Sequence, residues 1–139
     1  MPLVQLIYVS SACKELSDDE LDRILESSIR HNAQQGITGV LLYLNGNFMQ
    51  VIEGEEAAID ETYSRIRDDE RHKGLFVLAR DVIPERDFPG WSMGFRRLTK
   101  RDVEHHPAFA PFLLGGFDAA TIGARPGAVT EMLRQFSRV

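Results

Sequence analysis

The sequence predicts an α+β domain with the element order βαββαββ. Two segments show the apolar spacing of amphipathic helices, and short runs rich in β-branched and aromatic residues lie before, between and after them. Asn45-Gly46 lies between two of these runs, and this dipeptide is the typical signal of a tight type I′ hairpin. Such an order favours one sheet with helices packed against it.

The bulk properties predict a small globular protein of ordinary composition. A chain of 139 residues has the size of one domain. Its net charge of -5 argues against a general nucleic-acid binder, and its longest apolar stretch, residues 40–44, is far short of the ~20 residues of a membrane helix. We see no secretory signal, and the single Cys13 excludes an intrachain disulfide. We therefore expect a cytoplasmic protein without direct contact to nucleic acid or membrane.

The first predicted units are a strand over residues 3–10 and a helix. Ser17 and Glu20 have the spacing of a capping box, which starts a helix that we expect to continue to about Asn32. The apolar stripe of this helix is Leu21, Ile24 and Leu25. The same stripe then reaches Ser28 and Asn32, so polar groups replace apolar ones at the C-terminal end.

A hairpin and a second helix are predicted next. Gly36 ends the first helix, residues 37–44 form a strand, and the strand that contains Gln50 closes at Gly54. Residues 55–69 then form an amphipathic helix. Its expected buried line is Ile59, Tyr63 and Ile66.

Two more strands, at residues 75–83 and 91–95, complete the prediction. The simplest arrangement is ferredoxin-like, with a five-stranded mixed sheet and both helices on one face. We expect residues 1–97 to form this domain. Residues 98–139 would be a C-terminal helical extension that covers the other face of the sheet.

Gln50 is a polar residue inside an apolar strand. It lies in the run Phe48-Met49-Gln50-Val51-Ile52-Glu53-Gly54, which is apolar on both alternating faces, so the strand should be covered on both sides. A buried amide without partners would cost roughly 1 to 3 kcal/mol. Tyr8 ends a similar run, Leu6-Ile7-Tyr8. If Gln50, Tyr8 and Asn32 face the space between sheet and helices, they would suit a planar heterocycle with imide-like edges.

Several motifs of this chain occur in one order and spacing. They are Leu6-Ile7-Tyr8, Asn32, Gly36-Ile37-Thr38-Gly39, the Gln50 run, Asp69-Glu70-Arg71-His72 and Phe88-Pro89-Gly90-Trp91-Ser92-Met93. Each motif alone is weak, but the set is specific. From Leu3 to about Phe95, the chain resembles a BLUF domain, the blue-light sensor that uses FAD.

The resemblance implies roles for individual residues. Tyr8 would be the photochemical electron and proton donor, and Gln50 would bridge the Tyr8 hydroxyl and the flavin N5/O4 edge. Asn32 would hold the N3/O4 edge. The further expected flavin contacts are Ile24 and Ile66, which would sandwich the ring, with Arg65, Asp69 and His31. Trp91 and Met93 occupy the positions of the family's switch strand.

The resemblance also implies a function without substrate turnover. The cofactor would be FAD, with FMN or riboflavin as alternatives, and light would rearrange the hydrogen bonds of Gln50. The chain would not be an enzyme, and it would signal through a separate partner protein of unknown identity. Sheet edges and the apolar tail make a homo-oligomer plausible.

Two other functions compete with this reading. The first is a small ferredoxin-like hydrolase that uses Glu53, His72 or Arg71, although no nucleophile or phosphate-binding loop is apparent. The second is an interaction module without a ligand. A purely structural role is also an alternative for some residues, since Arg65 and Asp69 would form a solvated i, i+4 pair on one helix.

Overall fold

A computed structural model describes residues 2–13, 16–44, 46–89, 94–97 and 101. Within these residues the predicted order βαββαββ is confirmed. The elements are β1 (Leu3–Ala12), α1 (Asp18–Gln35), β2 (Thr38–Leu44), β3 (Asn47–Glu55), α2 (Glu56–Arg67), β4 (His72–Ile83) and β5 (Gly94–Arg97).

The five described strands form one sheet in the order β4-β1-β3-β2-β5. Strands β1 to β4 pair antiparallel, and β5 pairs with β2 in parallel, so the sheet is mixed. The central strands β1 and β3 are hydrogen-bonded along their length, from Leu3 opposite Glu55 to Ser11 opposite Asn47. This register fixes which side chains of the two strands lie next to each other.

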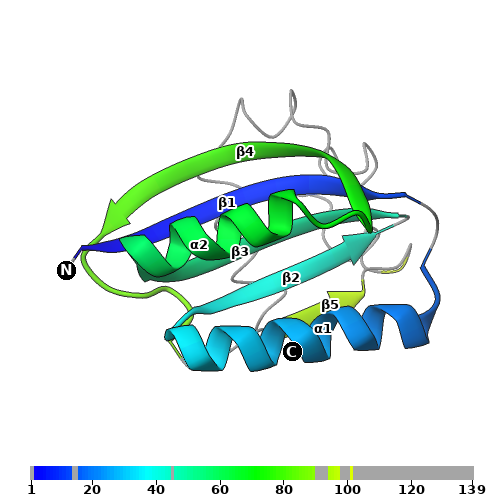
Figure 1. Cartoon of the computed structure of the whole chain (residues 1–139), viewed down its shortest axis with the longest axis horizontal. Coiled ribbons are helices and arrows are strands. Elements are labelled where there is room, and N and C mark those ends of the chain that lie inside the picture. The colour runs from blue at the N-terminus through cyan, green and yellow to red at the C-terminus, as the bar shows by residue number, and fades with distance from the viewer. Residues whose placement is uncertain (1, 14–15, 45, 90–93, 98–100, 102–139) are drawn as a thin grey trace.

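Both helices lie on the same side of the sheet, α2 over β1 and β3, and α1 along β2 and β5 (Figure 1). Helix α1 starts at the predicted capping box, because the Ser17 hydroxyl accepts from Glu20 N and the Glu20 carboxylate accepts from Ser17 N. It ends at Gly36, which adopts the left-handed φ of 67° that glycine tolerates best. Leu21 and Ile59 anchor the two helices in a shared core with one face of the sheet.

Strand β3 is buried on both faces, as its sequence predicts. All residues from Phe48 to Gly54 are buried. The side chains that alternate away from the helices, Met49, Val51 and Glu53, have exposed fractions of 0%. Gln50 therefore lies in the interior of the molecule.

The structure corrects several predicted bounds, and α1 continues to Gln35 instead of ending at about Asn32. Helix α2 ends at Arg67 instead of Asp69, and β4 begins at His72, three residues before the predicted start at Leu75. The reason is pairing: His72 and Lys73 lie opposite Ala12 and Ser11 of β1, and this extends the strand through a polar segment that has no apolar pattern. The described part of β5, Gly94–Arg97, continues past the predicted end at residue 95, and residues 91–93 of the predicted strand lie outside the described residues.

Some predictions fall on parts of the chain that the structure does not describe. Trp91 and Met93 lie outside the described residues, and so does the proposed extension apart from Arg101. Within the described residues, neither helix is long and apolar enough to cross a membrane.

Candidate functional site

Tyr8 and Gln50 lie directly opposite each other on the paired strands β1 and β3. Their exposed fractions are 3% and 5%. Both alternate toward the helices, with Leu6 and Ile52 as neighbours in the core. The register thus places a buried phenol beside a buried amide.

A cleft lies between the two helices, with Tyr8 and Gln50 on its sheet side. It has two parts, each with a cavity volume of about 80 Å³. The residues that line both parts are Ser28, Gln50, Ile66, Asp69 and Arg71. Because the two parts share these walls, we treat them as one cleft.

All eight predicted flavin contacts line this cleft. One part is lined by Tyr8, Ile24, Gln50, Ile66 and Asp69, and the other by His31, Asn32, Gln50, Arg65, Ile66 and Asp69. Residues separated by up to 61 positions in the chain are therefore brought together. Their individual roles toward a flavin stay predictions.

His31 connects the two helices across the cleft. Arg65 of α2 hydrogen-bonds to the Nδ1 atom of His31, and His31 Nε2 lies 3.0 Å from the Thr62 hydroxyl. A guanidinium only donates, so Nδ1 must accept and the ring proton lies on Nε2. Burial and the positive charge of Arg65 both lower the pKa of His31 below 6.5, which favours this neutral ring.

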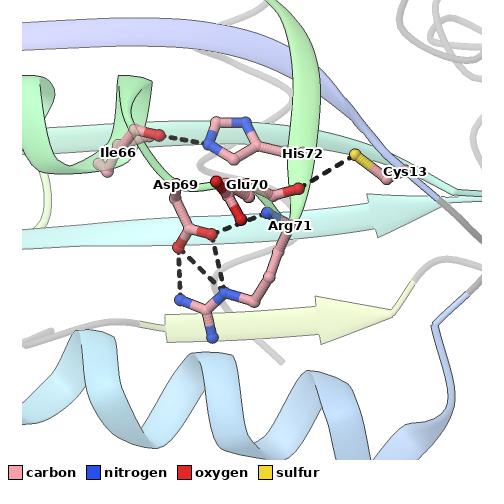
Figure 2. Close-up of polar contacts among 6 residues, drawn as sticks. All are labelled: Cys13, Ile66, Asp69, Glu70, Arg71 and His72. Atoms are coloured by element: carbon pink, nitrogen blue, oxygen red, sulfur yellow. Dashed lines mark hydrogen bonds and ion pairs between the residues drawn. The ribbon is translucent and has the colours of Figure 1, made fainter.

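The alternative prediction that Arg65 and Asp69 form a pair on one helix is wrong. Helix α2 ends at Arg67, so Asp69 lies in the turn before β4, where its carboxylate accepts from Arg71 Nε at 2.9 and 3.0 Å (Figure 2). These hydrogen bonds lower the pKa of Asp69 below 3.8, and they raise the pKa of Arg71. The cleft therefore has an ion pair at the α2–β4 turn, and Arg65 is directed to His31.

His72 follows the same turn, opposite Ala12 of β1, and it lines the same part of the cleft as Tyr8. Its Nε2 atom hydrogen-bonds to the Ile66 carbonyl, which can only accept, so Nε2 carries a proton (Figure 2). Among the described residues the Nδ1 atom of His72 is buried and has no hydrogen-bond partner. An unpaired buried nitrogen fits a cleft that receives a ligand with polar groups.

Tyr8 remains protonated across the whole neutral range. Burial is the largest cause that raises its pKa far above 10.0, and the charges of Asp69 and Tyr63 act in the same direction. Its hydroxyl therefore keeps a proton that it can donate in a hydrogen bond.

Sequence reasoning missed part of the lining. Thr62 was not predicted, although it lies one turn before Ile66 on the buried side of α2, and a polar residue at such a position is a usable signal. Leu41 and Phe48 supply apolar walls. Nothing in the sequence separates them from other core residues.

The arrangement does not support the hydrolase alternative. Glu53 alternates to the face of β3 opposite Gln50, whereas His72 and Arg71 line the cleft. The three residues therefore do not form one site. No cluster of metal-ligating side chains occurs in the part of the chain that the structure describes.

The residues that line the cleft fit a flavin ring in their chemistry. Ile24 and Ile66 provide apolar contact, and the amides of Asn32 and Gln50 can each donate and accept. Arg65 adds a donor at the same end as Asn32. A ring with an N–H and carbonyl oxygens on one edge needs this mixture of donors and acceptors.

The fold and the cleft define a class of protein: a small α+β domain that binds a ligand between two helices beside a buried Tyr–Gln pair. The family described as "BLUF: Sensors of blue-light using FAD" matches residues 3–94, which is well over half of the chain. The chain belongs to the BLUF family. The predicted resemblance is thus confirmed, and with it the assignment as a flavin-based sensor of blue light.

Similar proteins and solved structures support the membership of this family. Photoactivated adenylate cyclase subunit beta of Euglena gracilis is 39% identical over 92 residues, 66% of this chain and 11% of that protein. A solved bacterial light-regulated adenylyl cyclase has a TM-score of 0.74 at 36% identity, covering 79% of this chain and 33% of the other. BlrB, a BLUF protein in its dark state, has a TM-score of 0.68 at 32% identity, covering 88% and 96%. This chain spans about a tenth of the Euglena protein, so the activity of that whole protein is not transferred to it.

Proposed function

We propose that this chain is a blue-light photoreceptor that binds FAD between α1 and α2 and signals through a separate partner protein. The observation that carries the proposal is the Tyr8–Gln50 pair. Both side chains are buried and directly opposite in the β1–β3 register, and both line the cleft.

The residues of the cleft have distinct tasks in this proposal. Asn32 and Arg65 hold the imide edge of the ring, while Ile24 and Ile66 pack against its two faces. A bound flavin supplies a strong oxidant when it absorbs blue light. The Tyr8 phenol would give an electron and a proton to the excited flavin and then take both back, so the chain would carry out no net reaction.

In this proposal Gln50 is the residue whose hydrogen bonds change. Its amide has an acceptor end and a donor end, and it lies next to a phenol that can donate. When the Tyr8 proton leaves and returns, the amide rotates or tautomerises and presents a different end to Tyr8 and to the ring edge. The altered hydrogen bonds outlast the light and red-shift the absorption of the ring slightly.

The signal then passes to a partner. Strand β3 is central in the sheet, so a shift at Gln50 reaches both neighbouring strands. Strand β4 forms one edge and exposes Phe76 and Val82 with exposed fractions of 54% and 71%. An apolar sheet edge supports self-association or contact with another protein.

Absorption spectroscopy tests the proposal. Purified protein reconstituted with FAD should be yellow and should show a reversible red shift under blue light. Tyr8→Phe and Gln50→Ala should bind FAD and lose the shift. Protein that stays colourless after reconstitution, or a shift that persists in both variants, contradicts the proposal.

Tyr63→Phe is the matched control. Tyr63 lies on α2 close enough to raise the pKa of Tyr8, but it is not among the residues that line the cleft. Its removal should leave the light-induced shift intact. Loss of the shift in this variant would show that the Tyr63 phenol is also required, and it would contradict the special role of Tyr8.

A further inference from the structure

Glu53 is a fully buried carboxylate on the face of β3 that points away from the cleft. A buried charge is tolerated only when hydrogen bonds replace its water. Glu53 accepts three: from Gln5 Nε2 at 2.8 Å, from Asp87 N at 2.9 Å and from Phe88 N at 2.8 Å. Two of the three donors belong to the segment that follows β4.

Gln5 reinforces this cluster. Its amide nitrogen also donates to the Asp87 carboxylate at 2.8 Å, so one side chain of β1 bridges two carboxylates. Phe88 is itself buried, with an exposed fraction of 2%. Residues 87 and 88 are therefore held against the central strands β1 and β3.

Arg86 attaches the same segment to the elements around the cleft. Its guanidinium donates to the Glu53 carbonyl at 2.8 Å, to the Thr38 hydroxyl at 2.9 Å and to the Gly36 carbonyl at 2.7 Å. Gly36 is the C-cap of α1, and its N–H donates to the Asn32 carbonyl. Arg86 thus links β3, β2 and the end of the helix that carries Asn32.

Residues 86–88 consequently touch the two elements that carry the amides of the cleft. Glu53 lies three positions after Gln50 on one paired strand, and Gly36 lies four positions after Asn32. A paired strand moves as a unit, so a displacement at Gln50 displaces Glu53 and its donors. Strand β3 thus connects Gln50, on the face of the sheet that the helices cover, with Glu53 on the opposite face.

We propose that Glu53 is a positioning residue that couples the cleft to residues 86–88, so that FAD binding tightens this segment and release of the segment weakens FAD binding. The inference rests on the proposed flavin site. Thermodynamic linkage makes the effect reciprocal: the factor by which FAD favours the closed segment equals the factor by which the closed segment favours FAD.

Residue-resolved hydrogen exchange measured by NMR tests the coupling in the full chain. The amides of Asp87 and Phe88 should exchange more slowly with FAD than without it, by about fivefold or more beyond the slowing seen in β4. The β4 amides among residues 79–82 that donate to β1 serve as the internal reference for global stabilisation. FAD affinity is measured on the same samples by titration.

Glu53→Gln should remove the coupling. An amide has one oxygen in place of two, so it cannot accept all three hydrogen bonds and it faces a donor with its own NH2. The variant should lose the FAD-dependent slowing at residues 87 and 88, and its FAD affinity should fall by the same factor. Thr38→Val, which removes one acceptor of Arg86 from an otherwise unchanged strand, should give a smaller change in the same direction even if Glu53→Gln unfolds.

Glu55→Gln is the control. Glu55 lies on the same strand and on the same face, but it is exposed. It should keep both the affinity and the FAD-dependent slowing.

Equal exchange at residues 87 and 88 with and without FAD in the unaltered chain overturns the coupling while the flavin site stands. No FAD binding at all overturns the flavin site and the coupling together.

Discussion

The protonation states of two side chains in the cleft are determined by their surroundings. His31 is the clearest case, because Arg65 occupies Nδ1 as a donor and so requires an unprotonated nitrogen there. Tyr8 is the second case, because burial keeps its hydroxyl protonated and therefore neutral. Two titratable groups thus face the cleft in their neutral forms.

His31 gives the protein a pH dependence of known sign. The folded state lowers its pKa below the ordinary value of 6.5, so the unfolded chain binds the proton more readily. The stabilisation is complete above pH 6.5 and decreases as the pH falls below that value. Urea unfolding of the flavin-free protein between pH 8 and 5 should show this loss.

His31→Gln is the reference for this measurement. A glutamine carbonyl can accept from Arg65 but does not titrate, so the variant should lose less stability between pH 6.5 and 5. If the two proteins change in parallel over this interval, another group is responsible.

At the scale of elements, the β2–β3 hairpin determines how Gln50 is presented. Gly39 of β2 pairs with Ile52, close to Gln50. A Cβ at Gly39 would lie 2.0 Å from the Val51 carbonyl oxygen, which is a backbone atom of the neighbouring strand. The two strands approach closely at this point because no side chain separates them.

Gly39→Ala should therefore destabilise the protein by about 1–3 kcal/mol or more, because the strands must separate or shift to accept the methyl group. Gly54→Ala is the comparison on β3. There the new Cβ meets a side-chain atom of Ile37 at 3.2 Å, which can move. Denaturant midpoints should fall further for Gly39→Ala than for Gly54→Ala, and the reverse order would show that the close approach is not rigid.

At the scale of the whole molecule, the cleft links the two helices and the sheet, so its occupation should stabilise the entire fold. FAD at a hundred times its Kd should add about 2.7 kcal/mol, equivalent to a rise in Tm of roughly 5–10 °C. Thermal unfolding with and without FAD measures this rise.

Ser28→Phe should abolish the rise in Tm. Ser28 lines both parts of the cleft, and a phenyl ring there would occupy the shared space. The variant should retain the Tm of the flavin-free protein, within a few degrees. A full rise in Tm with FAD in this variant would place the flavin elsewhere.

Local sequence signals predicted most of the fold. The capping box at Ser17, the C-cap at Gly36 and the Asn45-Gly46 turn each act within a few residues, and the elements that they delimit are observed. Predictions failed where long-range pairing decides. Strand β4 begins at a polar His72 because β1 supplies its hydrogen-bond partners, and no local pattern records this.

The candidate site was predicted in composition but only partly in its contacts. All eight expected residues line the cleft, because their motifs lie on elements whose order and faces the periodicity fixes. The structural alternative for Arg65 was a pair with Asp69, four positions away. The structure instead pairs it with His31, 34 positions away, since the helix ends before Asp69.

The sequence by itself determined the element order, the burial of β3 on both faces and the presence of a phenol and two amides near one cleft. These features follow from local periodicity, capping and turn chemistry. Only the tertiary structure decided that Tyr8 lies opposite Gln50, that His31 is neutral and that Glu53 binds residues 87 and 88. Such contacts depend on strand register and on where helices end, and the partners lie 34 to 42 positions apart in the chain.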